Sequence, residues 1–118
     1  GVVLVPNYLH TGIFYGRRFM FINPNKQGTL FAIDKIRNIK YSLNQLSWAC
    51  AEGQLIDESS DSVFIWKPVP MILPVSKLAR EYFGSETYIN KAKLSQNKLD
   101  LKINHGYKKL FNSNWKAI

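Results

Sequence analysis

The sequence predicts an α+β fold in a single domain: an N-terminal β-hairpin followed by a helix-rich unit. Three observations predict this class. The first forty residues are rich in aromatic and β-branched side chains, which favour strands. Residues with the spacing of a helix-capping box stand at the start of a stretch in which apolar residues recur at helical intervals from residue 43. Residues 98–103 alternate polar with apolar side chains, as a half-buried strand does.

The N-terminal hairpin is predicted by two strand-like runs, residues 13–22 and residues 29–33. Between them stands NPNKQG, residues 23–28, whose Asn, Pro and Gly content is typical of a turn. Residues 1–40 are therefore expected to form a β-hairpin extension, and residues 2–5 to add a short strand.

The middle of the chain predicts one helix and one strand. Ser42 and Gln45 have the spacing of a capping box, and the following apolar residues lie on one face, which predicts a helix over 43–52. The run VFIWK, residues 63–67, predicts a short buried strand. Three prolines in residues 68–74 exclude a helix interior and indicate an extended segment.

The stretch PVSKLAREYFGSETYINKAKL, residues 74–94, predicts two short helices at about 76–83 and 86–94. Gly84 interrupts the apolar pattern, and Ser85 is placed to cap the second helix. The period-two pattern that follows, with the turn residues NHG, predicts a β-hairpin with a basic face over residues 98–111.

From residue 43 onward the expected order is helix, strand, helix, turn, helix, hairpin, which resembles winged helix-turn-helix DNA-binding domains over residues 42–112. Within the helix pair, Ala79 stands where such domains place a small residue and Leu78 precedes it. Ile89 and Ala92 follow at the spacing of the apolar positions of the second helix. Gly84 stands one position later than the glycine of the usual turn.

Charge also points to a polyanion partner. The net charge is +8, and it is uneven: residues 1–60 hold six basic and four acidic residues, and residues 61–118 hold ten and four. Such asymmetry is typical of nucleic-acid-binding proteins, and double-stranded DNA is the expected partner. The alternative is a basic surface that has no partner.

The resemblance implies that the second helix enters the major groove and that the hairpin contacts phosphates. Asn90 would then pair with adenine, and Lys91 with guanine or phosphate. The residues expected to contact nucleic acid are Arg80, Ser85, Thr87, Tyr88, Asn90, Lys91, Lys93, Lys98, Lys102, His105, Lys108 and Lys109.

A second basic patch is formed by Arg17 and Arg18, which stand beside Tyr15 and Phe19. Aromatic and basic side chains together bind single-stranded nucleic acid by stacking and charge. The alternative is that the aromatic rings fill the core while the arginines are solvated.

Two further functions remain open. His10 and His105 would supply the acid and base of a small metal-independent nuclease, such as an RNase toxin domain. An exposed sheet edge would make the chain a protein-interaction module in a larger assembly. We expect a non-catalytic domain rather than an enzyme, and the ends of the chain suggest a piece of a larger protein.

The sequence argues against a disulfide, a cysteine-based metal site and a membrane span. The chain has one cysteine, Cys50, which excludes an internal disulfide and a cysteine-based zinc site. No apolar run is long enough to span a membrane. We therefore expect no cofactor, no metal, no membrane contact and an intracellular, such as cytoplasmic, location.

Overall fold

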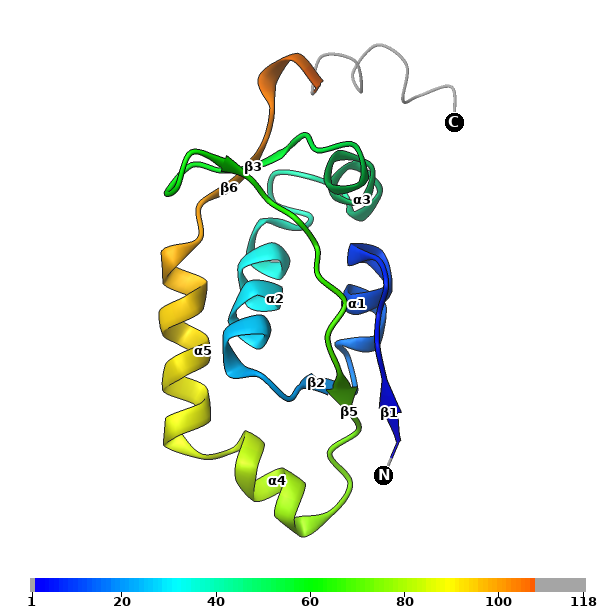
Figure 1. The fold of residues 1–118 in the computed structure, drawn as a ribbon, viewed down its shortest axis with the longest axis vertical. Helices are drawn as coiled ribbons and strands as arrows, with labels where there is room; N and C mark the ends of the chain where they lie inside the picture. The colour runs from blue at the N-terminus through cyan, green and yellow to red at the C-terminus, as the bar shows by residue number, and fades with distance from the viewer. Residues whose placement is uncertain (1, 108–118) are drawn as a thin grey trace.

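The computed structural model describes residues 2–107, and Figure 1 shows their arrangement. Within these residues, five helices are combined with two small antiparallel sheets, so the predicted α+β class is confirmed. The elements in chain order are β1 (Val3–Leu4), α1 (Leu9–Tyr15), β2 (Met20–Phe21), α2 (Pro24–Ile36), α3 (Leu43–Ala51), β3 (Leu55–Asp57), β4 (Ser62–Val63), β5 (Met71–Ile72), α4 (Lys77–Phe83), α5 (Glu86–Lys98) and β6 (Leu101–Ile103).

The predicted N-terminal β-hairpin is wrong, because α2 covers the whole of its second arm, residues 29–33, and the first arm begins within α1 and keeps only the two-residue strand β2. In α1, Leu9, Gly12 and Ile13 are buried at helical spacing, while Phe14 projects into solvent. Aromatic composition favoured a strand there, but the positions of the buried residues follow the period of a helix.

The stretch predicted as a turn begins α2 instead. The side chain of Asn23 accepts a hydrogen bond from the Asn25 backbone and caps the helix, and Pro24 occupies its first position. Proline is favoured there because that backbone N–H has no partner within the helix. One turn later the buried Gln27 accepts a hydrogen bond from the Phe21 backbone through Oε1, at 2.9 Å.

The first sheet has the order β1–β5–β2 and joins three distant parts of the chain. Met71 of β5 is fully buried and pairs with Leu4 on one side and with Phe21 on the other. The strand predicted near residues 2–5 is therefore present, and the proline-rich stretch is extended, as its composition predicts.

The helix predicted at 43–52 is confirmed as α3. Its capping box is complete: the Ser42 hydroxyl accepts from the Gln45 backbone at 3.1 Å, and the Gln45 side chain accepts from the Ser42 backbone at 2.8 Å. The strand predicted over 63–67 is much shorter, because β4 ends at Val63. Beyond it, Trp66 donates to the Pro6 carbonyl and lies where a side chain on Gly12 would collide with its ring.

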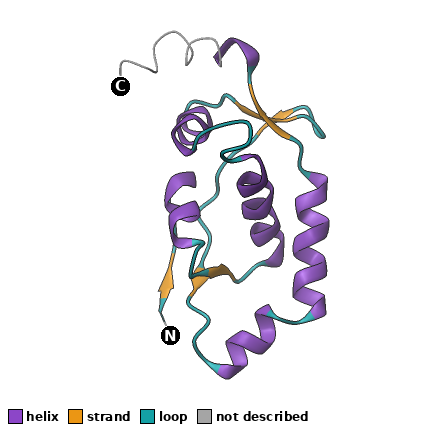
Figure 2. Cartoon of the chain, turned by 180° about the vertical axis from the view of Figure 1, so that it is seen from behind, coloured by secondary structure: helices purple, strands orange, loops and turns teal. Residues whose placement is uncertain are grey.

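The two helices predicted in the stretch 74–94 are present as α4 and α5, with α5 extending to Lys98. Their packing differs from that of a helix-turn-helix, because α5 lies along α2 (Figures 1 and 2). The buried Ala92 meets Gly28 of α2, whereas Leu78 of α4 is 79% exposed and Ile89 is 38% exposed. Leu78 and Ile89 therefore do not occupy the buried positions that the resemblance to a helix-turn-helix implies.

The β-hairpin predicted over residues 98–111 is also wrong over the part that the structure describes, residues 98–107. A single strand, β6, follows α5 and pairs with β3, so the second sheet has the order β4–β3–β6. The pattern of alternation is confirmed, because Leu101 and Ile103 are buried and Lys102 is exposed. Residues 105–107 form a helical turn rather than the turn of a hairpin, and residues 108–111 lie outside the described residues.

The helices and the sheets share one hydrophobic core, which includes Ile13, Ile33, Leu46, Leu55 and Met71. This core fixes α2 in the middle of the molecule, with α1 and α3 on one side and α5 on the other (Figure 1). Across residues 2–107, none of the helices has the length and apolar character that a membrane span requires.

Candidate nucleic-acid interface

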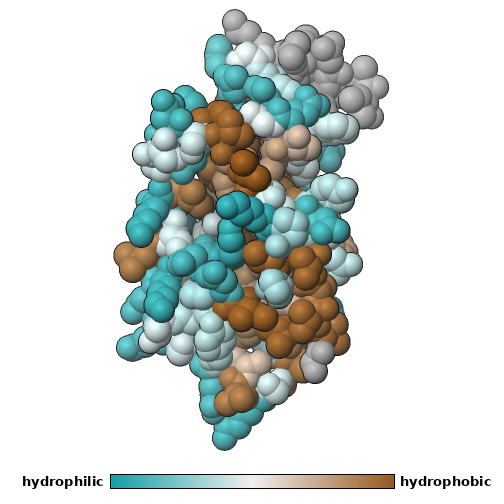
Figure 3. Space-filling model, in the orientation of Figure 1, coloured by the Kyte–Doolittle hydropathy of each residue, from teal (hydrophilic) through white to brown (hydrophobic). Residues whose placement is uncertain are grey.

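The solvent side of α5 is the most basic helical surface in the described chain. Lys91, Lys93 and Lys98 are exposed, and none of them forms an ion pair with any residue between 2 and 107. Lys91 and Lys98 are seven residues apart, so they share one flank of the helix at a spacing of about 10 Å. Lys93 lies on the other flank, facing α2. Figure 3 shows this side of the molecule as mostly hydrophilic, while hydrophobic residues gather over β1 and α1.

The N-terminus of α5 is fixed by Ser85. Its hydroxyl accepts from the Tyr88 backbone at 3.2 Å and donates to the Tyr82 carbonyl at 2.7 Å, so the capping role predicted for Ser85 is confirmed. Both hydrogen-bonding functions of this hydroxyl are thus used within the protein. Thr87 and Asn90 project into solvent, as the prediction requires.

Tyr88 is not available for contact with bases, which corrects the prediction for this residue. Its side chain is 2% exposed, and its hydroxyl donates to the Phe21 carbonyl. Tyr88 also packs edge-on against Phe83, with ring centroids 5.1 Å apart. Burial raises the pKa of the Tyr88 phenol, and the neighbouring Tyr82 raises it further. The residue therefore anchors α5 to β2.

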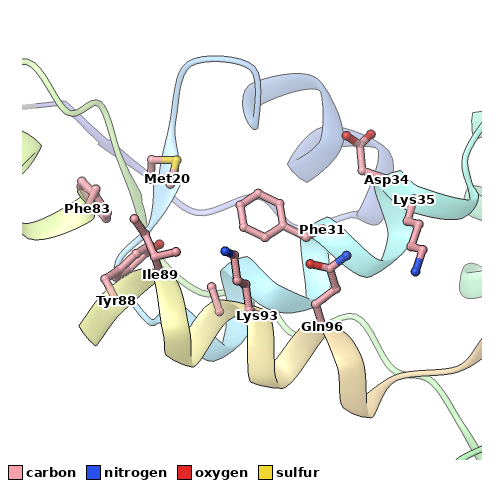
Figure 4. Close-up of a pocket in the computed structure, with 10 residues that line it drawn as sticks. Met20, Phe31, Asp34, Lys35, Phe83, Tyr88, Ile89, Lys93 and Gln96 are labelled. Carbon is pink, nitrogen blue, oxygen red and sulfur yellow. The ribbon is translucent and has the colours of Figure 1, made fainter. Parts of the chain in front are cut away.

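A groove of about 500 Å³ lies between α2 and α5 (Figure 4). Each helix contributes an apolar side chain and a lysine one turn later: Phe31 and Lys35 from α2, and Ile89 and Lys93 from α5. Figure 4 shows Lys93 extending from α5 toward the Phe31 ring. The remaining lining residues are Met20, Asp34, Phe83, Tyr88, Ala92 and Gln96.

This groove was not predicted from the sequence, although one signal for it was present. Phe31 and Lys35 are four residues apart, as Ile89 and Lys93 are, and on helices both pairs share a face. Because residues 29–33 were interpreted as a strand, the first pair could not be recognised.

The other predicted basic contacts are dispersed. Lys102 forms an ion pair with Glu58 at 2.9 Å, which raises the pKa of Lys102. Arg80 is exposed on α4, and His105 is exposed in the helical turn after β6. Lys108 and Lys109 lie outside the described residues. The structure thus brings Lys91, Lys93 and Lys98 together on one helix and places Lys102 on the second sheet.

The second basic patch is present in part. Arg17 and Arg18 are exposed between α1 and β2. Tyr15 and Phe19 pack edge to face, with ring centroids 5.8 Å apart, and Phe19 also contacts the hydrophobic core. The Phe19 ring is therefore engaged in packing rather than displayed for stacking.

A larger groove, of about 1130 Å³, lies between α1 and α3 and is mainly apolar. Phe14 of α1 and Trp48 of α3 are 63% and 50% exposed at its sides. Within the described chain, no lysine, arginine, aspartate or glutamate lines it. This groove therefore lacks the positively charged side chains found on the surface of α5.

The two histidines considered as the acid and base of a nuclease are not brought together. The His10 ring stacks on Tyr8, and no hydrogen bond or ring contact between residues 2 and 107 joins His10 to His105. The carboxylate of Asp57 accepts hydrogen bonds from Ser59, Ser60 and the Asp100 backbone. Partial burial raises its pKa, but these hydrogen bonds outweigh burial and lower it. No group of three or more potential metal ligands is found in the described residues.

Comparison with models of known protein families, with curated protein sequences and with solved structures found no match.

Proposed function

We propose that this domain binds nucleic acid without catalysis, through the exposed lysines of α5. The observation that carries this proposal is that Lys91, Lys93 and Lys98 project from one helix with no ion-pair partner in the described chain. The phosphates of a nucleic acid would supply the negatively charged partners that these lysines lack, and binding would release the counterions condensed on the nucleic acid. The net charge of +8 favours the same class of partner.

The position of α5 supports a binding role because contacts with α2 and β2 fix the helix on its buried side. Gly28 of α2 allows backbone contact with Ala92, and the Tyr88 hydroxyl bonds to β2. A rigid helix presents its lysines at fixed spacing, which reduces the entropy lost on binding.

Rival functions have less support. Recruitment of a partner strand needs a usable sheet edge, yet the edge strands β1, β2 and β4 contain two residues each and the edge strand β6 contains three. A histidine-based nuclease needs its acid and base to act on one substrate, and nothing in the described structure links His10 with His105. We therefore do not propose either function.

The test is fluorescence anisotropy with labelled duplex DNA, single-stranded DNA and single-stranded RNA, measured between 50 and 200 mM KCl. If the protein contacts three phosphates, raising KCl from 50 to 200 mM should lower its affinity for duplex DNA by about 40-fold and for single strands by about 20-fold. Lys91→Gln combined with Lys98→Gln should reduce the slope of log affinity against log salt by about two.

The matched control is Lys67→Gln, an exposed lysine that follows Trp66 in the segment between β4 and β5. This control should leave the slope nearly unchanged. If wild-type affinity does not vary with salt, the proposed function fails. If Lys67→Gln lowers the slope as much as each α5 lysine does, binding is spread over the surface and α5 is not the interface.

A further inference from the structure

The groove between α2 and α5 combines an apolar surface with positive charge. Phe31 and Ile89 face it from opposite helices, each with 38% of its surface exposed. Lys35 and Lys93 follow them by one turn. In Figure 4, Lys93 extends toward the Phe31 ring, and Lys35 lies at the far end of the groove with its side chain directed away from that ring.

The charged side chains that line this groove give it a net positive charge. Asp34 is the only acidic residue among its described lining residues, and Arg37 binds the Asp34 carboxylate at 2.8 Å. Lys35 and Lys93 form no ion pair with any residue between 2 and 107. An anionic ligand would thus meet two uncompensated lysines.

The apolar surface is fixed in position. Phe83 and Tyr88 line the groove together with Ile89, and their rings pack against each other and against Tyr82. No other aromatic ring of the described chain packs against Phe31, so its ring is available to a ligand. An exposed ring between lysines is the arrangement by which proteins stack unpaired bases while holding the phosphates beside them.

We propose that this groove binds single-stranded nucleic acid, with one base stacked on Phe31 and the adjacent phosphates held by Lys35 and Lys93. The inference rests on the proposed function and deepens it by naming an unpaired strand as the ligand. In a duplex the faces of the bases are covered by their neighbours, so a side chain can stack only on an unpaired base. A groove of about 500 Å³ falls within the range of sites that hold one small ligand.

The experiment compares a mixed-sequence single-stranded DNA 12-mer with an abasic 12-mer that has the same backbone. A single-stranded RNA 12-mer and a DNA hairpin duplex complete the probe set. Fluorescence anisotropy is measured at 50 mM KCl. The wild-type protein should bind the strand with bases about 5- to 150-fold more tightly than the abasic strand, the range that one stacked base contributes. The ratio of the DNA and RNA affinities then identifies the sugar that the site prefers.

Three variants test the position of the stacked base. Phe31→Ala should lose the preference for bases, while Phe31→Tyr, which keeps a ring, should retain it. The matched control is Phe14→Ala, which removes an exposed phenylalanine from α1 at the other groove. This control should bind all probes as the wild type does.

The outcomes separate this inference from the proposed function. If the wild-type protein binds the abasic strand as tightly as the normal one, no base stacks and the inference is wrong, whatever the stability of the variants. Binding that keeps its preference for bases in Phe31→Ala also overturns it, because the base then stacks elsewhere. In both cases salt-dependent binding through Lys91 and Lys98 can persist. If no probe binds at 50 mM KCl, the proposed function fails and the inference fails with it.

Discussion

Gly28 of α2 lies so close to Ala92 of α5 that a methyl group on Gly28 would collide with the Ala92 carbonyl oxygen. The same methyl group would stand 2.7 Å from the Ser95 Cβ and 2.9 Å from the Gln96 nitrogen. Alanine is the better helix former by about 1 kcal/mol, yet these atoms belong to a helix that cannot move independently of the core. The close approach of the two helices therefore depends on glycine at this position.

The first prediction follows from this contact. Gly28→Ala should lower the free energy of unfolding by about 1–3 kcal/mol, because overpacking must push the two helices apart. Denaturation with urea, followed by circular dichroism, measures the change. Gly106→Ala is the control, since a methyl group there would meet no atom within 4 Å. Equal stability of the wild type and Gly28→Ala would show that α2 and α5 do not pack at this point.

The second prediction concerns two tyrosines that bond to adjacent carbonyls. The Tyr88 hydroxyl donates a hydrogen bond to the backbone carbonyl of the buried Phe21. The Tyr82 hydroxyl donates a hydrogen bond of 2.8 Å to the backbone carbonyl of the exposed Ile22. Tyr88→Phe should cost about 1–3 kcal/mol of stability, because water cannot easily replace the lost donor. Tyr82→Phe should cost less, because its acceptor remains open to water. The same denaturation experiment compares the two variants, and the reverse order would contradict the prediction.

The third prediction is a loss of stability in alkaline solution. Burial raises the pKa of Tyr88 in the folded protein above its ordinary value of 10.0. Above pH 10 the unfolded chain therefore releases this proton while the folded chain keeps it, so stability falls as the pH rises. A single group of this kind contributes at most about 1.4 kcal/mol per pH unit. Thermal unfolding between pH 8 and 11 should show a flatter decline for Tyr88→Phe, and parallel curves would exclude Tyr88 as a cause.

The fourth prediction concerns Asp57, whose carboxylate links the turn after β3 to the residue before β6. Its hydrogen bonds lower the pKa of Asp57 below the ordinary 3.8, so they stabilise the fold above that pH and are lost as the pH falls. Asp57→Ala should cost about 1–3 kcal/mol at pH 7 and progressively less as the pH falls below 3.8. Asp100→Ala is the control, because the donor at that residue is the backbone N–H, which alanine keeps. A cost for Asp57→Ala that does not change with pH would contradict this account.

The helices after residue 42 were predicted better than those before it, for a local reason. The hydroxyls of Ser42 and Ser85 each bond to the backbone three residues later, and this spacing is visible in the sequence. The helices before residue 42, α1 and α2, have no comparable serine cap, and the aromatic residues in this part of the chain favoured strands. Asn23 and Pro24, which begin α2, were interpreted as turn residues because both types are common in turns as well as at helix starts.

The candidate site was predictable only in part. The lysines of α5 follow from charge and helical spacing. The burial of Tyr88 does not, because it depends on a carbonyl in β2, far away in the sequence. The groove beside Phe31 likewise forms only where α2 meets α5, and contacts between distant segments leave no local pattern.

The bond from Tyr88 to Phe21 spans 67 residues, and this separation sets an order of events during synthesis. A chain that grows from its N-terminus at about 5–20 residues per second completes Tyr88 roughly 3–13 s after Phe21. Throughout that interval the face of α2 around Gly28 has no helix to cover it, and β2 lacks its tyrosine donor. Closure of the core on this side therefore waits for α5 to be synthesised. A nascent chain that pauses before residue 86 would expose this apolar face to other proteins for the length of the pause.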